Sequence, residues 1–272
     1  MMLGATIIVF REVLEAALII GIAAAAARGS RGRGRWLAGG AIIGLLAATI
    51  VAALAGELTN LAGGNGQELL NAAILAVAVL MLAWHNIWMS RHARQLARDT
   101  RRLGEAVAEG HRDLSALATV VALAVMREGS ETVLFLYGLL AGGDGTTAPV
   151  ATGATLGLAL GALVGIGLYA GLLRIPPRLF FSATSGLILL LAAAMASQCA
   201  RILIQADWLP SLASPLWDTS RLLADDSALG RLLHALVGYD ASPAGMQVIF
   251  YSTALVAIAA GMRLARVPAR NT

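Results

Sequence analysis

Two short charged motifs interrupt apolar stretches of this chain and share the pattern Arg-Glu-x-x-Glu. They comprise Arg11, Glu12 and Glu15 in the first, and Arg127, Glu128 and Glu131 in the second. On a helix of 3.6 residues per turn, each motif places two carboxylates on one side, with the arginine within reach of the second. Two arginines neutralise only two of the four glutamates, so a formal charge of −2 remains.

These charged groups are costly where the sequence places them. A lone charge near the centre of a membrane helix costs about 2.5–3.5 kcal/mol, so six unpaired groups would cost on the order of 15–20 kcal/mol. That is comparable with the whole stability of a domain. We therefore expect the two motifs to face each other or a wet cavity.

The surplus negative charge suggests a cation pathway. Such a site either takes up protons or attracts a multivalent cation, and hard oxygen ligands suit Mg²⁺, Ca²⁺, Mn²⁺ and iron better than soft ions such as copper(I). The alternative is a pair of self-satisfied Arg–Glu bridges that only hold helices together. Bridges alone do not require the surplus carboxylates, so we favour the cation pathway. The residues themselves name no metal.

The elements that carry the motifs are predicted to be membrane helices. Hydrophobic residues make up 58% of the 272 residues and charged residues 13%, against about 25% charge in soluble domains; the mean hydropathy is +0.76. Seven stretches reach the roughly 20 apolar residues that a spanning helix needs: 3–27, 36–56, 68–89, 114–141, 148–173, 179–206 and 246–264. None alternates with period two, so we predict an all-α integral membrane protein rather than a barrel.

Arginine placement predicts the orientation, because cytoplasmic loops carry the excess of basic residues. The formal charge of +4 comes from arginine without any lysine. Basic residues follow the first, third, fifth and seventh stretches: Arg28, Arg31, Arg33, Arg35, Arg91, Arg94, Arg98, Arg101, Arg102, Arg112, Arg174, Arg178, Arg263, Arg266 and Arg270. The N-terminus is therefore expected outside and the C-terminus in the cytoplasm. Clusters in membrane loops do not indicate nucleic-acid binding.

An internal repeat organises the single membrane domain. We predict repeat one over about 3–89, a cytoplasmic loop at 90–113, repeat two over about 114–206, an outer amphipathic segment at 207–245 and the seventh helix at 246–264. The motif arginines are offset by 116 residues, and the glycine ladders that begin at Gly40 and Gly153 by 113. Three helices per copy require the copies to be inverted, an architecture common in secondary transporters.

Several other features permit two interpretations. The glycine ladders favour close packing within one protomer over dimerisation. His85, between two tryptophans, is interpreted as an interfacial polar residue rather than a metal ligand. Acidic residues of the 90–113 loop are expected on a solvated, mostly helical linker. In the outer segment, leucines at helical spacing before Gly238 predict a short amphipathic helix on the membrane surface or over a cavity mouth. Asp225 and Asp226 beside its start complement the helix dipole; outer metal collection is the secondary interpretation.

Across its whole length the chain resembles the oxidase-linked iron permease family, the high-affinity iron transporters, and most of all its bacterial EfeU-type members. The resemblance rests on the two motifs on the first and fourth of seven helices, and on outer sequences at 215–220 and 232–240. It implies that Glu12, Glu15, Glu128 and Glu131 coordinate iron during passage, with Arg11 and Arg127 in support. Ser130 departs from the apolar residue common at its position.

The resemblance also implies partners and location. Iron, as Fe²⁺ or Fe³⁺, is the transported substrate, and no resident cofactor is expected. The partners are the lipid bilayer, separate extracytoplasmic iron-binding or oxidase/peroxidase proteins, and an optional second copy of the chain. The expected location is the bacterial inner membrane. Two alternatives stay open: a carrier for another divalent metal or a proton-coupled solute, and an intramembrane di-metal enzyme. The Glu-x-x-His pairs of di-iron bundles are absent from the predicted spans, which disfavours the enzyme.

Overall fold

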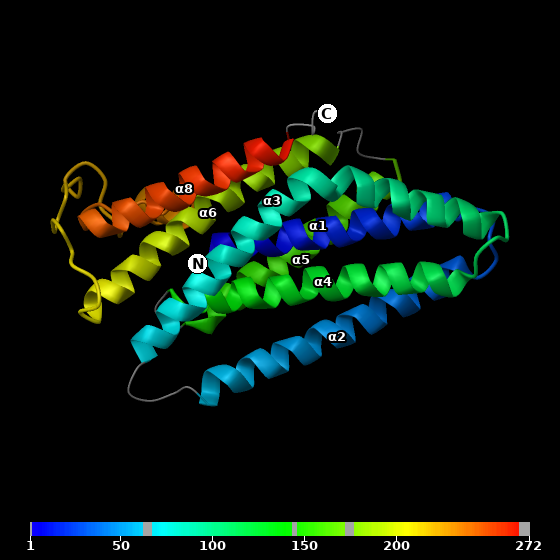
Figure 1. The fold of residues 1–272 in the computed structure, drawn as a ribbon, viewed down its shortest axis with the longest axis horizontal. Coiled ribbons are helices and arrows are strands. Elements are labelled where there is room, and N and C mark those ends of the chain that lie inside the picture. Colours follow the sequence, from blue (N-terminus) through cyan, green and yellow to red (C-terminus); the bar gives the residue numbers. More distant parts are fainter. Residues whose placement is uncertain (1, 62–66, 143–145, 172–176, 267–272) are drawn as a thin grey trace, which may run out of the picture.

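A computed structural model describes residues 2–61, 67–142, 146–171 and 177–266. Within these ranges the chain forms helices and no strands: α1 (Met2–Ala26), α2 (Arg33–Leu61), α3 (Gln67–Ala108), α4 (Leu114–Ala141), α5 (Thr147–Tyr169), α6 (Pro177–Gln205), α7 (Ala228–Val237) and α8 (Gly245–Arg266). The long helices run side by side along the longest axis of the molecule (Figure 1). The all-α class predicted from the sequence is confirmed. Arg174 and Arg270 lie outside the described residues.

Five helical segments in the described ranges are long and apolar enough to cross a membrane. They are Arg33–Leu54, Glu68–His92, Thr147–Tyr169, Ala183–Gln205 and Gly245–Ala265. Helices α1 and α4, with 25 and 28 residues, also have the length of a span. Each of these two helices contains the three charged residues of one motif. They differ from the other five in charge content and not in length.

Two predicted boundaries differ from the structure. Helix α2 continues to Leu61, beyond the end of the predicted stretch at 36–56. Helix α3 runs for 42 residues to Ala108, about 63 Å at 1.5 Å per residue. The predicted 90–113 loop is therefore mostly an extension of α3, as its interpretation as a helical linker required. That extension contains no proline, and its helix-forming residues are supported by an Arg101–Glu105 pair one turn apart.

The glycine ladders bring two pairs of helices into close contact. α5 packs along α1, and α2 packs along α4. A Cβ atom at Gly157 would lie 2.5 Å from the carbonyl oxygen of Thr6, and one at Gly44 would lie 2.5 Å from that of Ala122. No side chain fits at such distances, so only glycine permits these approaches. The predicted packing role within one protomer is confirmed.

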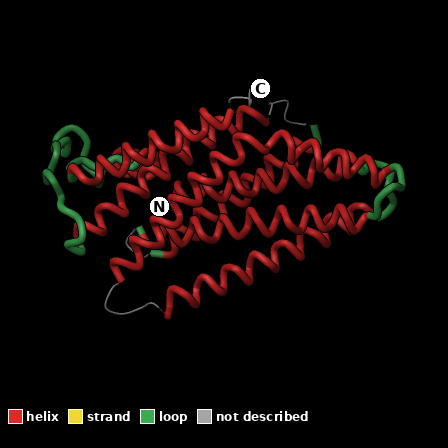
Figure 2. The backbone as a smooth tube through the Cα atoms, in the orientation of Figure 1, coloured by secondary structure: helices red, strands yellow, loops and turns green. Residues whose placement is uncertain are grey.

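The described connections at 27–32, 109–113 and 206–227 lie toward two ends of the bundle (Figure 2). The 206–227 loop and the start of α1 lie at one end, whereas the turns at 27–32 and 109–113 lie together at the other (Figure 1). Helices α3, α6 and α8 pack on one another beside α1 and α4. The short helix α7 packs on α6 and α1; the Ser227 hydroxyl accepts from Gly230 at its start, and Gly238 ends it in the left-handed conformation. The predicted amphipathic helix with a glycine cap is confirmed.

Candidate metal centre

Direct packing of α1 against α4 brings the two charged motifs together. Glu12, Glu15 and Glu128 are all at least 98% buried, so these carboxylates are removed from solvent. Glu131 is partly buried beside them. The structure thus places all four motif glutamates in one region between the two helices, where their charges must be balanced locally.

In the α1 motif, one arginine holds both of its own glutamates. The Nη1 atom of Arg11 donates to Glu12 Oε1 at 2.9 Å, and its Nη2 atom lies 2.8 Å from Glu15 Oε1. The Arg11 side chain is 1% exposed. This two-pronged hold fixes the orientation of both carboxylates and neutralises one of the two charges.

In the α4 motif, the arginine reaches only one glutamate. The Nε atom of Arg127 donates to Glu131 Oε1 at 3.0 Å, and its guanidinium carbon lies 4.2 Å from the ring centroid of Trp88. Its side chain is 31% exposed, so it lies at the edge of the cluster. Glu128 has no arginine partner, and neither of its buried oxygens has a hydrogen-bond partner among the described residues.

A histidine from α3 completes the cluster. His85 is 2% exposed; its Nδ1 atom contacts Glu131 Oε2, and its Nε2 atom lies 3.7 Å from Glu15 Oε1. The interpretation of His85 as an interfacial residue is therefore wrong. Trp84, its neighbour, is 71% exposed and faces outward, but successive helix residues are turned by about 100°. The sequence feature that could have predicted the buried position of His85 is a lone ionisable residue within an apolar span.

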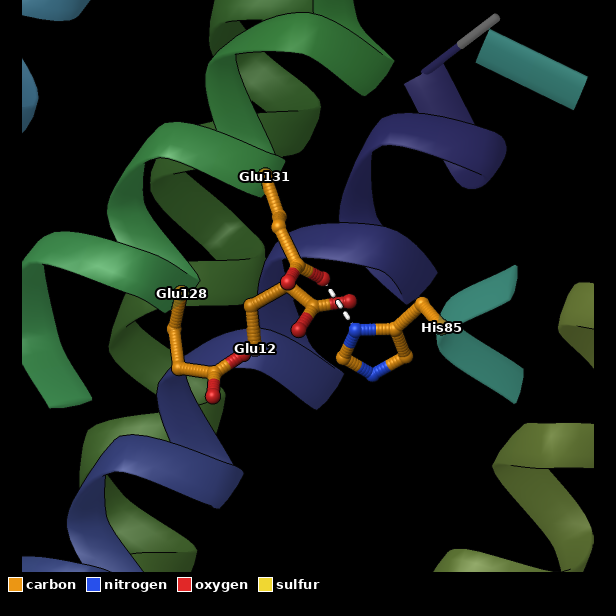
Figure 3. A group of neighbouring side chains, drawn as sticks. All are labelled: Glu12, His85, Glu128 and Glu131. Carbon is orange, nitrogen blue, oxygen red and sulfur yellow. Dashed lines mark ion pairs between the residues drawn. The ribbon is translucent and has the colours of Figure 1, made fainter. Parts of the chain in front are cut away.

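Four side chains from three helices have the geometry of a metal site. Glu12, Glu128, Glu131 and His85 each offer one donor atom, and these atoms lie within 4.8 Å of one another. Figure 3 shows the four side chains converging from α1, α3 and α4. Three carboxylates and an imidazole are a donor set that suits a divalent first-row transition metal. Glu15 is outside this set.

A polar cavity of about 440 Å³ lies toward the end of the bundle that contains the 206–227 loop. Its lining includes Gly4, Leu75, Gly138, Gln198, Arg201, Asp225, Arg231, His234 and Asp240. Ile8, Leu82 and Phe135, here called the apolar layer, are fully buried and belong to one apolar core cluster. On α4, Phe135 lies one turn from Glu131 on the side of Gly138. Likewise, on α1, Ile8 lies between Gly4 of the cavity lining and Glu12 of the cluster.

A second hollow, of about 710 Å³, reaches the cluster from the other direction. Glu12 and Glu128 line it, and nearly all its other walls are apolar residues of α1, α2, α4 and α5, as far as Arg33 at the start of α2. Glu12 and Glu128 therefore line a hollow whose walls extend toward the end where the basic turns gather.

The remaining sequence candidates do not join the cluster. Glu105 and Glu109 are exposed on the α3 extension and the turn after it, where they pair with Arg101 and His111. Asp225 accepts a hydrogen bond from the backbone of Ala241 and lines the polar cavity.

Comparisons with known proteins agree with the geometry. Residues 2–267 match the Iron permease FTR1 family. Proteins named "Ferrous iron permease EfeU" from Shigella sonnei (strain Ss046) and Escherichia coli O157:H7 are each 32% identical over 274 residues, covering 97% of this chain and 98% of theirs. The protein of that name from Yersinia pestis is 31% identical, covering 92% of this chain and 89% of its own. No solved structure is significantly similar to the chain.

Proposed function

The chain belongs to the iron permease FTR1 family, and we propose that it imports iron across a bacterial inner membrane through the paired Arg-Glu-x-x-Glu motifs of α1 and α4. Members of this family are permeases, so the chain is a multi-pass membrane transport protein and not an enzyme. Its relatives are named for ferrous iron, which makes Fe²⁺ the proposed substrate. The observation that carries the proposal is a buried set of carboxylates in which Glu128 has no cationic partner.

The motif glutamates Glu12, Glu15, Glu128 and Glu131 form the charged lining of the proposed iron site, and Arg11 and Arg127 support it. A dication entering a buried site loses most of its hydration, so the site must supply negative charge and oxygen donors in return. The surplus of two carboxylates matches the charge of one Fe²⁺ ion. Arg11 and Arg127 limit the repulsion among the glutamates when the site is empty.

The two hollows define the proposed path. Iron enters the polar cavity beneath the outer segment, passes the layer of Ile8, Leu82 and Phe135, and reaches the glutamates. It leaves through the hollow that reaches Arg33. The three residues of the layer are fully buried, whereas the second hollow touches Glu12 and Glu128. The proposed cycle therefore has two states. In one, the apolar layer is closed and the inner hollow is open; in the other, the layer is open and the hollow is closed.

Two inverted repeats of three helices, followed by α8, form the proposed membrane architecture of seven spans. Support comes from the helix pairings. In the two repeats, α1 corresponds to α4, α2 to α5 and α3 to α6. The α1–α5 contact of one repeat with the other therefore corresponds to the α4–α2 contact, and both are present. The contacts α1–α4 and α3–α6 each join two corresponding helices. Such correspondence is expected of two copies related by an axis in the membrane plane.

Orientation with the N-terminus outside is proposed from the basic turns, and labelling tests it. In a Cys199→Ser background, a cysteine at Thr146 should react with an impermeant thiol reagent in intact cells. A cysteine at Ser30 or Arg112 should react only after permeabilisation. Thr100 is unsuitable because it is buried. Labelling of position 30 from outside would contradict the orientation.

Partners beyond lipid and iron are proposed as separate chains. No segment of the described residues forms a second globular domain, so extracytoplasmic iron-binding or oxidase/peroxidase proteins would act from outside. The acidic and basic residues that line the outer cavity, including Asp225 and Arg231, are the surface that such a protein would approach.

Uptake of radioactive iron into proteoliposomes that contain only this chain is the decisive experiment. We expect Fe²⁺ uptake above protein-free vesicles, slower uptake of Fe³⁺, and weak competition by Mn²⁺ and Zn²⁺. A variant with glutamine at both Glu12 and Glu128 is the matched inactive control. More efficient uptake of Mn²⁺ or Zn²⁺ than of iron would assign the chain to another metal.

A further inference from the structure

We propose that His85 is a metal ligand through Nδ1 and that Glu15 is a positioning residue that holds the imidazole from its other nitrogen. The ion is then bound by Glu12, Glu128, Glu131 and His85, and the four motif glutamates are not equivalent. This inference rests on the proposed function, because it concerns the site through which iron passes. It assigns the fourth ligand to α3, which carries neither motif.

The donor atoms already lie close to the separation that a metal requires. All four lie within 4.8 Å of one another. Nitrogen and oxygen ligands bond first-row metals such as zinc at about 2.0–2.2 Å, so two ligands on opposite sides of the ion are about 4–4.4 Å apart. The donor separations of at most 4.8 Å are on this scale, but His85 Nδ1 and Glu131 Oε2 are in direct contact, so these two side chains must move apart for an ion to lie between them.

Glu15 is engaged elsewhere. Its Oε1 atom lies 2.8 Å from Arg11 Nη2 and 3.7 Å from His85 Nε2. Histidines that bind metals almost always donate their second ring N–H to a carboxylate, carbonyl or water, which fixes the tautomer and the ring orientation. The 3.7 Å separation is longer than a hydrogen bond, so in the proposed metal-bound state a small movement brings Glu15 close enough to accept that proton while Nδ1 faces the metal. Arg11 in turn holds Glu15 in place.

The imidazole gives the site a selectivity that carboxylates lack. Oxygen donors alone suit Mg²⁺, Ca²⁺ and Mn²⁺, whereas imidazole nitrogen suits iron, zinc and other transition metals. A site of three carboxylates and one imidazole therefore favours Fe²⁺ over the far more abundant Mg²⁺ and Ca²⁺. His85 is the only histidine whose side chain belongs to the described cluster.

The first test detects the ligand directly. Purified protein loaded with Mn²⁺ alone should show, by pulsed electron paramagnetic resonance, a nitrogen coupling that changes when histidine is labelled with ¹⁵N. His85→Gln should lose this coupling, whereas His111→Gln, which alters an exposed residue, should keep it. A variant with glutamine at His92, His111 and His234 should also keep it. That variant leaves His85 intact, so the result holds even if His85→Gln does not fold.

Transport selectivity is the second test. His85→Gln should lose at least about tenfold of the preference for Fe²⁺ over Ca²⁺ and Mg²⁺ in competition assays. Glu15→Gln should keep the nitrogen coupling but weaken Fe²⁺ binding by about 10–100-fold, the usual effect of removing an outer carboxylate partner. Wild-type protein that transports iron without any histidine coupling would overturn the inference alone. Wild-type protein that neither binds nor transports iron would instead overturn the proposed function.

Discussion

The α1 and α4 motifs share one sequence pattern, yet the structure places them in different surroundings. Arg11 is buried and holds both glutamates of its own motif. Arg127 is partly exposed, pairs only with Glu131 and makes a cation–π contact with Trp88. Glu128, the counterpart of Glu12, is left without an arginine.

This difference locates the surplus charge that the sequence could only count. The α1 motif is internally braced, so its glutamates are fixed in orientation. The α4 motif leaves one carboxylate with no protein cation, and that carboxylate is where a metal ion gains most. A third Arg–Glu pair with the same four-residue spacing, Arg101–Glu105, lies exposed on the α3 extension. The three pairs form a series from buried to solvated.

Glu128→Gln is the change with the largest expected effect. It should abolish iron uptake, because the amide keeps the shape but removes the charge that no arginine balances. The thermal stability of the purified protein should stay equal or rise, since a buried, unpaired carboxylate is removed. Radioactive iron uptake and melting temperature in detergent measure the two effects. Near-normal uptake would show that the two motifs do not divide their roles in this way.

Arg11→Gln should destabilise the protein by about 3–5 kcal/mol, the usual cost of removing one partner from a buried ion pair. The free energy of unfolding in mixed micelles is the measurement. Adding Glu15→Gln should recover part of the loss, because the orphaned carboxylate is then also neutral. A double variant that is no more stable than Arg11→Gln would contradict the bracing role.

Gly157→Val tests the helix that supports the α1 motif. The added side chain would meet the backbone of Thr6 and Phe10, and overpacking of this kind costs about 1–3 kcal/mol. We expect lower stability and reduced uptake from a displaced α1. Gly39→Val is the matched control, because a Cβ there meets nothing within 4 Å. Equal effects of the two variants would argue against close packing of α5 on α1.

Arg127→Gln should cost less than Arg11→Gln, about 1–2 kcal/mol. It removes one carboxylate contact and a cation–π interaction worth about 0.5–2 kcal/mol. The same unfolding measurement applies, and Trp88→Leu should reproduce part of the loss. A cost equal to that of Arg11→Gln would remove the contrast between the motifs.

Arg101→Gln should change stability by no more than about 0.5 kcal/mol, because exposed pairs at this spacing contribute little. The effect should shrink further at high salt, as screening weakens exposed charge pairs. Unfolding at two salt concentrations provides the check. A large, salt-insensitive loss of stability would mean that burial does not determine how much each of the three Arg–Glu pairs contributes to stability.

Much of the fold follows from local patterns in the sequence. The residue ranges of the predicted apolar stretches agree closely with those of the long helices, because a segment in lipid must satisfy its own backbone hydrogen bonds. The ladder from Gly153 predicted close helix packing without naming the partner. The end of α3 was harder to place, since hydropathy marks where a helix leaves the apolar region and not where the helix ends.

The candidate site was predictable only in part. The motif glutamates stand out because charges are rare in apolar spans. His85 was misplaced because a single helix does not reveal which of its faces a neighbour covers. The unequal partners of Arg11 and Arg127 depend on contacts between α1, α3 and α4, and no spacing along one helix encodes them.

The tight α1–α5 and α2–α4 pairs have a consequence for how bound iron acts on the protein. Glu12 belongs to one pair, and Glu128 and Glu131 belong to the other, so an ion at the proposed site would bond to both helix pairs at once. If a cation binds more tightly to the conformation with one separation of the two helix pairs, the equilibrium shifts toward that conformation by the ratio of the two affinities. Under the proposed function, iron would therefore act on the protein as well as cross it: the loaded state would favour one spacing of the helix pairs, and after release Arg11 and Arg127 alone would balance the glutamates.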